Sequence, residues 1–150
     1  MTEPAFKLKK NVKALLDEAA AKTQGISAQA AQAKLGDAGT VFVDIRDVRE
    51  LEREGMIPGA FHAPRGMLEF WVDPESKYYK PVFVPGKSYI LYCAADWRAT
   101  LAAGVLAEMG MDDVFHLEGG FEEWKKAGHP VGQRPHKETR GSPPASPPKA

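Results

Sequence analysis

Cysteine is almost absent from this sequence, in which Cys93 is the single one among 150 residues. An internal disulfide is therefore excluded, as is every zinc site built from several cysteine ligands. The four histidines show no spacing typical of metal ligands. We interpret His62 and His116 as structural, and we expect neither a metal nor a cofactor. Cys93 is consequently either an inert core thiol or the reactive group of the protein.

Long apolar runs and an excess of either charge are missing as well. No stretch approaches the roughly 18 residues of a membrane-spanning helix, and the first residues lack the charged-then-apolar pattern of a signal peptide. Basic and acidic side chains number 20 each, whereas nucleic-acid-binding proteins usually carry a basic excess. We therefore expect a cytoplasmic protein with neither nucleic acid nor membrane as a partner.

The chain has the length of one domain, and its composition divides it into three segments. Residues 1–25 form a basic N-terminal extension with an amphipathic helix predicted over 10–22. Residues 26–132 carry an acidic excess and most of the apolar side chains, as a folded domain would. Residues 133–150 are rich in proline and poor in apolar side chains, which predicts a disordered tail.

Short apolar segments alternate with helical patterns along the domain. The predicted strands are 40–45, 60–62, 88–92 and 114–117. The predicted helices are 27–35, 47–55, 66–72, 98–109 and 120–127, and Asp47 with Glu50 three residues later predicts a capping box. This alternation predicts an α/β fold with a mainly parallel, open sheet and helices on both faces.

Cys93 directly follows a predicted strand and precedes a helix that starts near Arg98. In open α/β sheets, ligands bind at the carboxyl ends of the strands. Successive backbone N–H groups of the intervening loop can form a concave anion site, to which the helix N-terminus adds partial positive charge. Both effects favour thiolate over thiol, so the sequence predicts a nucleophilic site at residues 93–98.

Four segments in chain order resemble the signatures of one protein family. They are VDIRD (43–47) with Glu50, GMIPGA (55–60) with His62, Tyr92-Cys93 with Arg98, and LEGGFEEW (117–124) closing on Gly128 and Pro130. From about residue 26 to residue 131 the sequence resembles the rhodanese-like family of sulfurtransferase domains, of the single-domain type. The resemblance implies a five-stranded, open and mainly parallel sheet with helices on both faces.

The resemblance also implies a persulfide cycle without a cofactor. Cys93 would take the outer sulfur of a donor such as thiosulfate and pass it to a thiophilic acceptor such as cyanide or a thiol. The loop N–H groups would stabilise the anionic sulfur. The residues expected to bind substrate are Ala94, Ala95, Asp96, Trp97 and Arg98. Because the chain has no second cysteine, the acceptor must come from outside it.

Charged residues near the loop have two kinds of expected role. Arg98 either binds substrate anions or holds the loop shape through backbone carbonyls or an acid in segment 44–50. Asp44 and Arg46 are expected to support the site structurally. Arg65 is a candidate pocket contact that would supply positive charge to a donor.

Two further residues of the loop each have two alternative expected roles. Trp97 either lines the mouth of the pocket or packs on the aromatic-rich segment 65–86. The family usually has glycine at position 96, where a carboxylate should oppose the thiolate and repel an anionic donor. Asp96 either points outward to cap the following helix or weakens thiosulfate turnover, and we expect Asp96→Gly to raise that turnover.

Other functions within the same fold stay open. The chain could be a sulfur-relay or protein-binding module with little thiosulfate activity, in which the N-terminal helix and the proline-rich tail contact a protein partner. Related phosphatases and arsenate reductases use a cysteine loop one residue longer. Four residues lie between Cys93 and Arg98, which favours sulfur transfer.

Overall fold

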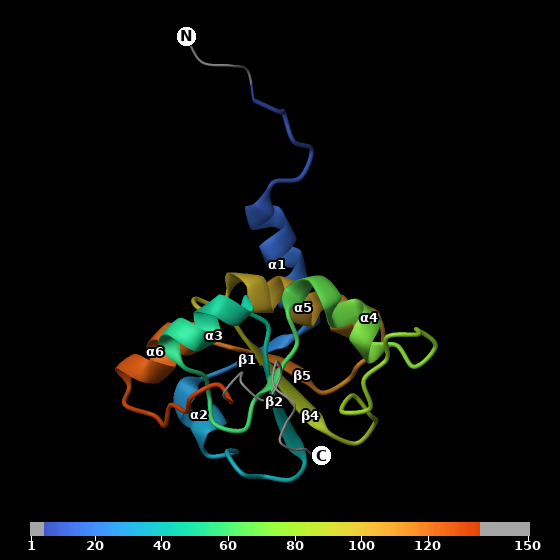
Figure 1. Ribbon diagram of the computed structural model, residues 1–150. Coiled ribbons are helices and arrows are strands. Elements are labelled where there is room, and N and C mark those ends of the chain that lie inside the picture. Colours follow the sequence, from blue (N-terminus) through green and yellow to red (C-terminus); the bar gives the residue numbers. More distant parts are fainter. Residues whose placement is uncertain (1–4, 136–150) are drawn as a thin grey trace.

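Five parallel strands form one open sheet in the order β1-β5-β4-β2-β3, with helices on both faces (Figure 1). This is a computed structural model, which describes residues 5–135. In chain order the elements are α1 (Val12–Lys22), β1 (Gln24–Ile26), α2 (Ala28–Gln32), β2 (Thr40–Asp44), α3 (Val48–Glu54), β3 (Phe61–His62), the 3₁₀ helix η1 (Arg65–Met67), α4 (Leu68–Val72), β4 (Ser88–Tyr92), α5 (Trp97–Glu108), β5 (Val114–Leu117) and α6 (Gly120–Lys126). The predicted α/β fold is confirmed.

The central strands β2 and β4 carry a core on each face of the sheet. Val43 and Leu91 belong to the apolar cluster that includes buried residues of α4 and α5. Phe42 and Ile90 belong to the cluster that includes buried residues of α2 and α6. Neighbouring side chains of a strand point to opposite faces, so a strand covered on both sides must be apolar throughout.

Helix α3 begins and ends where the sequence predicts. The Asp47 carboxylate accepts the N–H of Arg49 at 2.8 Å, and the Glu50 carboxylate accepts the N–H of Asp47 at 3.0 Å. Gly55 ends the helix with a φ of 83°, a conformation that glycine adopts without a steric penalty. The capping box fixes Glu50 in the first turn of α3, from which its side chain reaches the site described below.

Strand β1 is not predicted by the sequence patterns, which indicate four strands and none at residues 24–26. Gln24, Gly25 and Ile26 pair with β5 at the edge of the sheet. A Cβ on Gly25 would lie 2.5 Å from a carboxylate oxygen of Glu118, so only glycine fits without a shift. Three residues are too few to show an alternating pattern, and periodicity could not locate this strand.

Helix α1 packs on α5 (Figure 1). The contact is close because Gly104 has no Cβ; one built there would lie 2.6 Å from the Cβ of Ala19. Phe6 and Leu8, which precede α1, are exposed. None of the helices within residues 5–135 is long and apolar enough to cross a membrane. The predicted disordered tail spans residues 133–150, of which 136–150 lie outside the described residues.

Candidate active site

The sulfur of Cys93 lies at the carboxyl end of β4 and is surrounded by backbone donors. Its Sγ accepts the N–H of Asp96 at 3.2 Å and the N–H of Ala99 at 3.3 Å. Ala99 belongs to the first turn of α5, so the partial positive charge of that helix end reaches the sulfur. Cys93 is buried, with 1% of its surface exposed. These donors stabilise a negatively charged sulfur, as an anion site would.

Helix α6 holds the backbone carbonyls on the other side of the loop. The carbonyls of Cys93 and Ala94 accept the N–H groups of Phe121 at 2.8 Å and Glu122 at 3.0 Å. Gly120 makes this approach possible: its φ is 63°, and a Cβ there would lie 2.5 Å from the carbonyl oxygen of Ala94. With these carbonyls engaged by α6, the loop presents its donors to the sulfur.

Asp96 is the one residue other than glycine with a positive φ, 90°, within residues 5–135. It occupies the N-cap position of α5, but its side chain makes no capping hydrogen bond. The carboxylate instead lies 2.9 and 3.0 Å from Nδ1 of His116 and 3.2 Å from Oγ1 of Thr100. The expected outward cap is thus not what the structure shows. His116 contacts the site through Asp96, and no local sequence signal indicates this contact.

Arg98 joins the cysteine loop to α3. Its Nη1 and Nη2 donate to the two carboxylate oxygens of Glu50 at 3.0 and 3.1 Å. The hydrogen bond to Glu50 raises the pKa of Arg98, and nearby Cys93 acts in the same direction. The hydrogen bond from Arg98 in turn lowers the pKa of Glu50. Glu50 lies within segment 44–50, in which an acid is one of the partners predicted for Arg98.

A buried ion pair lies beneath the loop at the end of β2. Nη2 of Arg46 donates to Asp44 at 2.8 Å and to the carbonyl of Gly55 at 2.7 Å, and both ionic side chains are at most 1% exposed. The guanidinium carbon lies 4.4 Å from the ring centre of Phe121. This pair connects β2, the end of α3 and α6. That Asp44 and Arg46 support the cysteine loop stays a prediction.

Tyr92, immediately before the nucleophile, is part of the same buried support. Its hydroxyl oxygen accepts the N–H of Ile57 at 3.0 Å. Burial raises the pKa of Tyr92, and the nearby charge of Asp44 acts in the same direction. The phenol therefore stays neutral at physiological pH and serves to position the turn that follows α3.

Arg65 and Trp97 take positions that the sequence left open. Nη1 of Arg65 donates to Glu69 at 2.8 Å, one helical turn further along, and its side chain is one-third exposed. Trp97 is 68% exposed at the start of α5, so most of its side chain lies in solvent. A contribution of Arg65 to donor binding stays a prediction.

No group of three or more histidine, cysteine, aspartate or glutamate side chains within residues 5–135 is arranged to hold a metal ion. The charged side chains around the loop are instead engaged with one another. Glu50 binds Arg98, and Asp96 binds His116.

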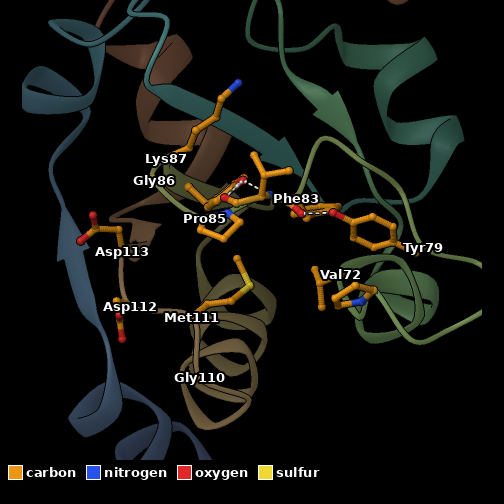
Figure 2. A pocket seen from close by; sticks show the side chains of 13 residues that line it. Val72, Tyr79, Phe83, Pro85, Gly86, Lys87, Gly110, Met111, Asp112 and Asp113 are labelled. Atoms are coloured by element: carbon orange, nitrogen blue, oxygen red, sulfur yellow. Dashed lines mark hydrogen bonds between the residues drawn. The ribbon is translucent and has the colours of Figure 1, made fainter.

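A pocket of about 360 Å³ lies at the other end of the sheet (Figure 2). Tyr89, near the start of β4, and Asp113, just before β5, belong to its lining, whereas Cys93 follows the far end of β4. The hydroxyl of Tyr79 donates to the carbonyl of Phe83, and that of Tyr89 binds backbone groups of the same loop. The pocket is separate from the candidate site.

A buried cysteine that receives loop N–H groups at the carboxyl end of a parallel sheet defines a class of cysteine-loop α/β proteins. The comparison with known families makes the assignment specific. The model of the rhodanese-like domain matches residues 27–127. The chain belongs to the rhodanese-like domain family, as the four sequence motifs predict.

Several solved structures are similar to this chain. A protein of unknown function from Rhodopseudomonas palustris, described as a possible tyrosine phosphatase, is 45% identical with a TM-score of 0.82; the match covers 86% of this chain and 99% of that one. A rhodanese-related protein from Thermoplasma volcanium is 23% identical with a TM-score of 0.61, covering 74% and 99%. Thiosulfate sulfurtransferase from Pseudomonas aeruginosa is 23% identical with a TM-score of 0.62, covering 74% and 19%. The last two matches show the shared fold.

Proposed function

We propose that this protein is a sulfurtransferase in which Cys93 carries the transferred sulfur as a persulfide. Membership of the rhodanese-like family supports the class of chemistry. The observation that carries the proposal is the position of Cys93 Sγ, which accepts two backbone N–H groups in a loop with four residues before Arg98. Such a site stabilises a negative sulfur atom before and after the transfer.

Two steps complete the proposed cycle. The Cys93 thiolate attacks the outer sulfur of a donor such as thiosulfate; a bond forms between Sγ and that sulfur, the S–S bond of the donor breaks, and sulfite leaves with the electron pair. A thiophilic acceptor such as cyanide or a thiol then attacks the outer persulfide sulfur. The bond to Sγ breaks, the thiolate is regenerated, and cyanide leaves as thiocyanate.

The surrounding residues have distinct parts in this cycle. The N–H groups of Asp96 and Ala99, with the N-terminal end of α5, stabilise the thiolate that attacks and later leaves. Arg98 is engaged by Glu50 and keeps the start of α5 against α3. We infer that Arg98 mainly holds the loop shape, while its positive charge also favours the approach of an anionic donor.

The decisive experiment is intact-protein mass spectrometry after brief incubation with thiosulfate. We expect the wild type to gain the mass of one sulfur atom and to lose it on addition of cyanide. Cys93→Ser should gain none, and since the sequence has no other cysteine, the difference reports on this residue alone. Circular dichroism of both proteins checks that the substitution leaves the fold intact.

A different result would redirect the proposal. If neither thiosulfate nor mercaptopyruvate nor a low-molecular-weight persulfide loads sulfur onto Cys93, the sulfurtransferase assignment is wrong. A protein-binding role of the same fold would then be the leading explanation, and capture of a partner by the wild type would be the next measurement.

Phosphatase activity is the second candidate, because the 45% identical structure from Rhodopseudomonas palustris is described as a possible tyrosine phosphatase. The loop of four residues between Cys93 and Arg98 argues against it, since a tetrahedral phosphate needs more room than a single sulfur atom. Hydrolysis of p-nitrophenyl phosphate that is lost in Cys93→Ser, without sulfur loading by any donor, would favour the phosphatase.

A further inference from the structure

The carboxylate of Asp96 is bound by a histidine from a different strand. Nδ1 of His116, on β5, lies 2.9 and 3.0 Å from its two oxygens, and Oγ1 of Thr100, on α5, lies 3.2 Å from one of them. The His116 and Asp96 side chains are only 11% and 18% exposed. An ionised carboxylate only accepts hydrogen bonds, so Nδ1 of His116 carries the proton and donates it.

The backbone of Asp96 needs this support. Its φ of 90° and ψ of −21° lie in the left-handed region, which glycine enters freely and other residues occupy at a cost. In this conformation the Asp96 N–H points to Cys93 Sγ, 3.2 Å away. Relaxation of Asp96 toward negative φ would turn that donor away from the sulfur.

We infer that His116 is a positioning residue of the cysteine loop: by binding the Asp96 carboxylate, it keeps the Asp96 N–H directed at the Cys93 sulfur. The inference rests on the proposed role of Cys93 as the nucleophile. The same hydrogen bonds engage the Asp96 charge with donors on β5 and α5, which limits its repulsion of an anionic sulfur donor.

The alkylation rate of Cys93 by iodoacetamide at neutral pH measures this support directly, because it needs no sulfur donor. His116→Leu removes the donor to Asp96, and we expect the rate to fall about tenfold, the effect of one hydrogen bond to a charged group. His116→Asn places an amide N–H near the position of Nδ1. It should retain about half of the wild-type rate or more.

The Asp96→Gly variant distinguishes a positioning role of His116 from a general effect of His116 on stability. Asp96→Gly can hold the positive φ without a side-chain partner, and we expect it to load sulfur from thiosulfate faster than the wild type, since it also lacks the charge. In this background His116→Leu should change the alkylation rate by less than about twofold, because there is no carboxylate left to hold.

Val114→Ala is the matched control, since it truncates a buried side chain at the opposite end of β5. It should lower the melting temperature and leave the alkylation rate unchanged. The inference is overturned if His116→Leu leaves the rate unchanged, or if it lowers the rate by the same factor in both backgrounds. If Cys93 takes up no sulfur but His116→Leu still lowers the alkylation rate only where Asp96 is present, the sulfurtransferase proposal is wrong and the positioning role of His116 stands.

Discussion

The carboxylate of Glu50 has two partners, and each explains part of its position. One oxygen accepts the N–H of Asp47 and caps α3, while both oxygens accept hydrogen bonds from Arg98. The Arg98 side chain is 44% exposed and that of Glu50 is 21% exposed, so solvent screens the pair. Its contribution to stability is therefore small, about 0.5–1 kcal/mol, and its main effect is to fix the loop geometry.

Glu50→Gln keeps the size and the capping acceptor but removes the charge. Because the pKa of Glu50 is lowered in the folded protein, its stabilising contribution is complete above the ordinary value of 4.5 and is lost as pH falls through the folded-state pKa. We expect the variant to be less stable than the wild type near pH 7 and the difference to shrink below pH 4.5. Urea unfolding across this pH range measures it.

Glu75→Gln is the control, since Glu75 is an exposed carboxylate outside the ion pairs found in residues 5–135. It should show no comparable trend with pH. A Glu50→Gln penalty that stays constant down to pH 3 would mean that the charge of Glu50 does not stabilise the fold through Arg98.

At the scale of elements, the junction between β5 and α6 shapes the cysteine loop from outside it. The first N–H groups of a helix have no partner within that helix, and here two of them bind the carbonyls of Cys93 and Ala94. Gly120 permits this contact because a side chain would collide with the loop. Gly120 of the LEGGFEEW motif thus shapes the loop that follows Cys93.

Gly120→Ala tests this junction, with Gly128→Ala as its matched control. Both glycines have positive φ, 63° and 83°, but a Cβ at position 128 meets nothing within 4 Å. Gly128→Ala should cost about 1 kcal/mol of unfolding free energy, the left-handed strain alone, and leave sulfur loading unchanged. Gly120→Ala should cost more than about 2 kcal/mol and lower the loading rate about tenfold or more.

Urea unfolding and mass-spectrometric loading kinetics provide the two readouts. Equal effects of the two substitutions on loading would show that the approach of α6 to Ala94 does not shape the loop.

At the scale of the whole molecule, the N-terminal segment has two parts with different roles. Helix α1 lies against α5 through the close contact of Ala19 with Gly104, and β1 adds the edge strand next to β5. Phe6 and Leu8, in contrast, are exposed ahead of the helix. Helix α1 and strand β1 therefore complete the fold, whereas residues 5–11, ahead of α1, are exposed outside the core.

Two deletions separate these parts. Removal of residues 1–25 should lower the unfolding free energy by several kcal/mol, because it uncovers the α1-facing side of α5 and removes most of β1. Removal of residues 1–10 leaves α1 and its cap Asn11 in place and should change stability by less than about 0.5 kcal/mol.

Chemical denaturation measures both deletions. Unchanged stability after removal of residues 1–25 would show that α1 and β1 do not support the core. Unchanged stability together with lost binding of a protein partner would support a docking role for the helix.

The local pattern of this chain determined its α/β class, most elements, the α3 capping box and the position of Cys93 at a strand end. These features depend on side-chain period and on residues adjacent in sequence, which a single sequence contains. Tertiary structure decided the rest. The edge strand β1 exists only through its pairing with β5, and the contact of His116 with Asp96 spans 20 residues. Such contacts form where strands and helices meet in space, so no local pattern encodes them.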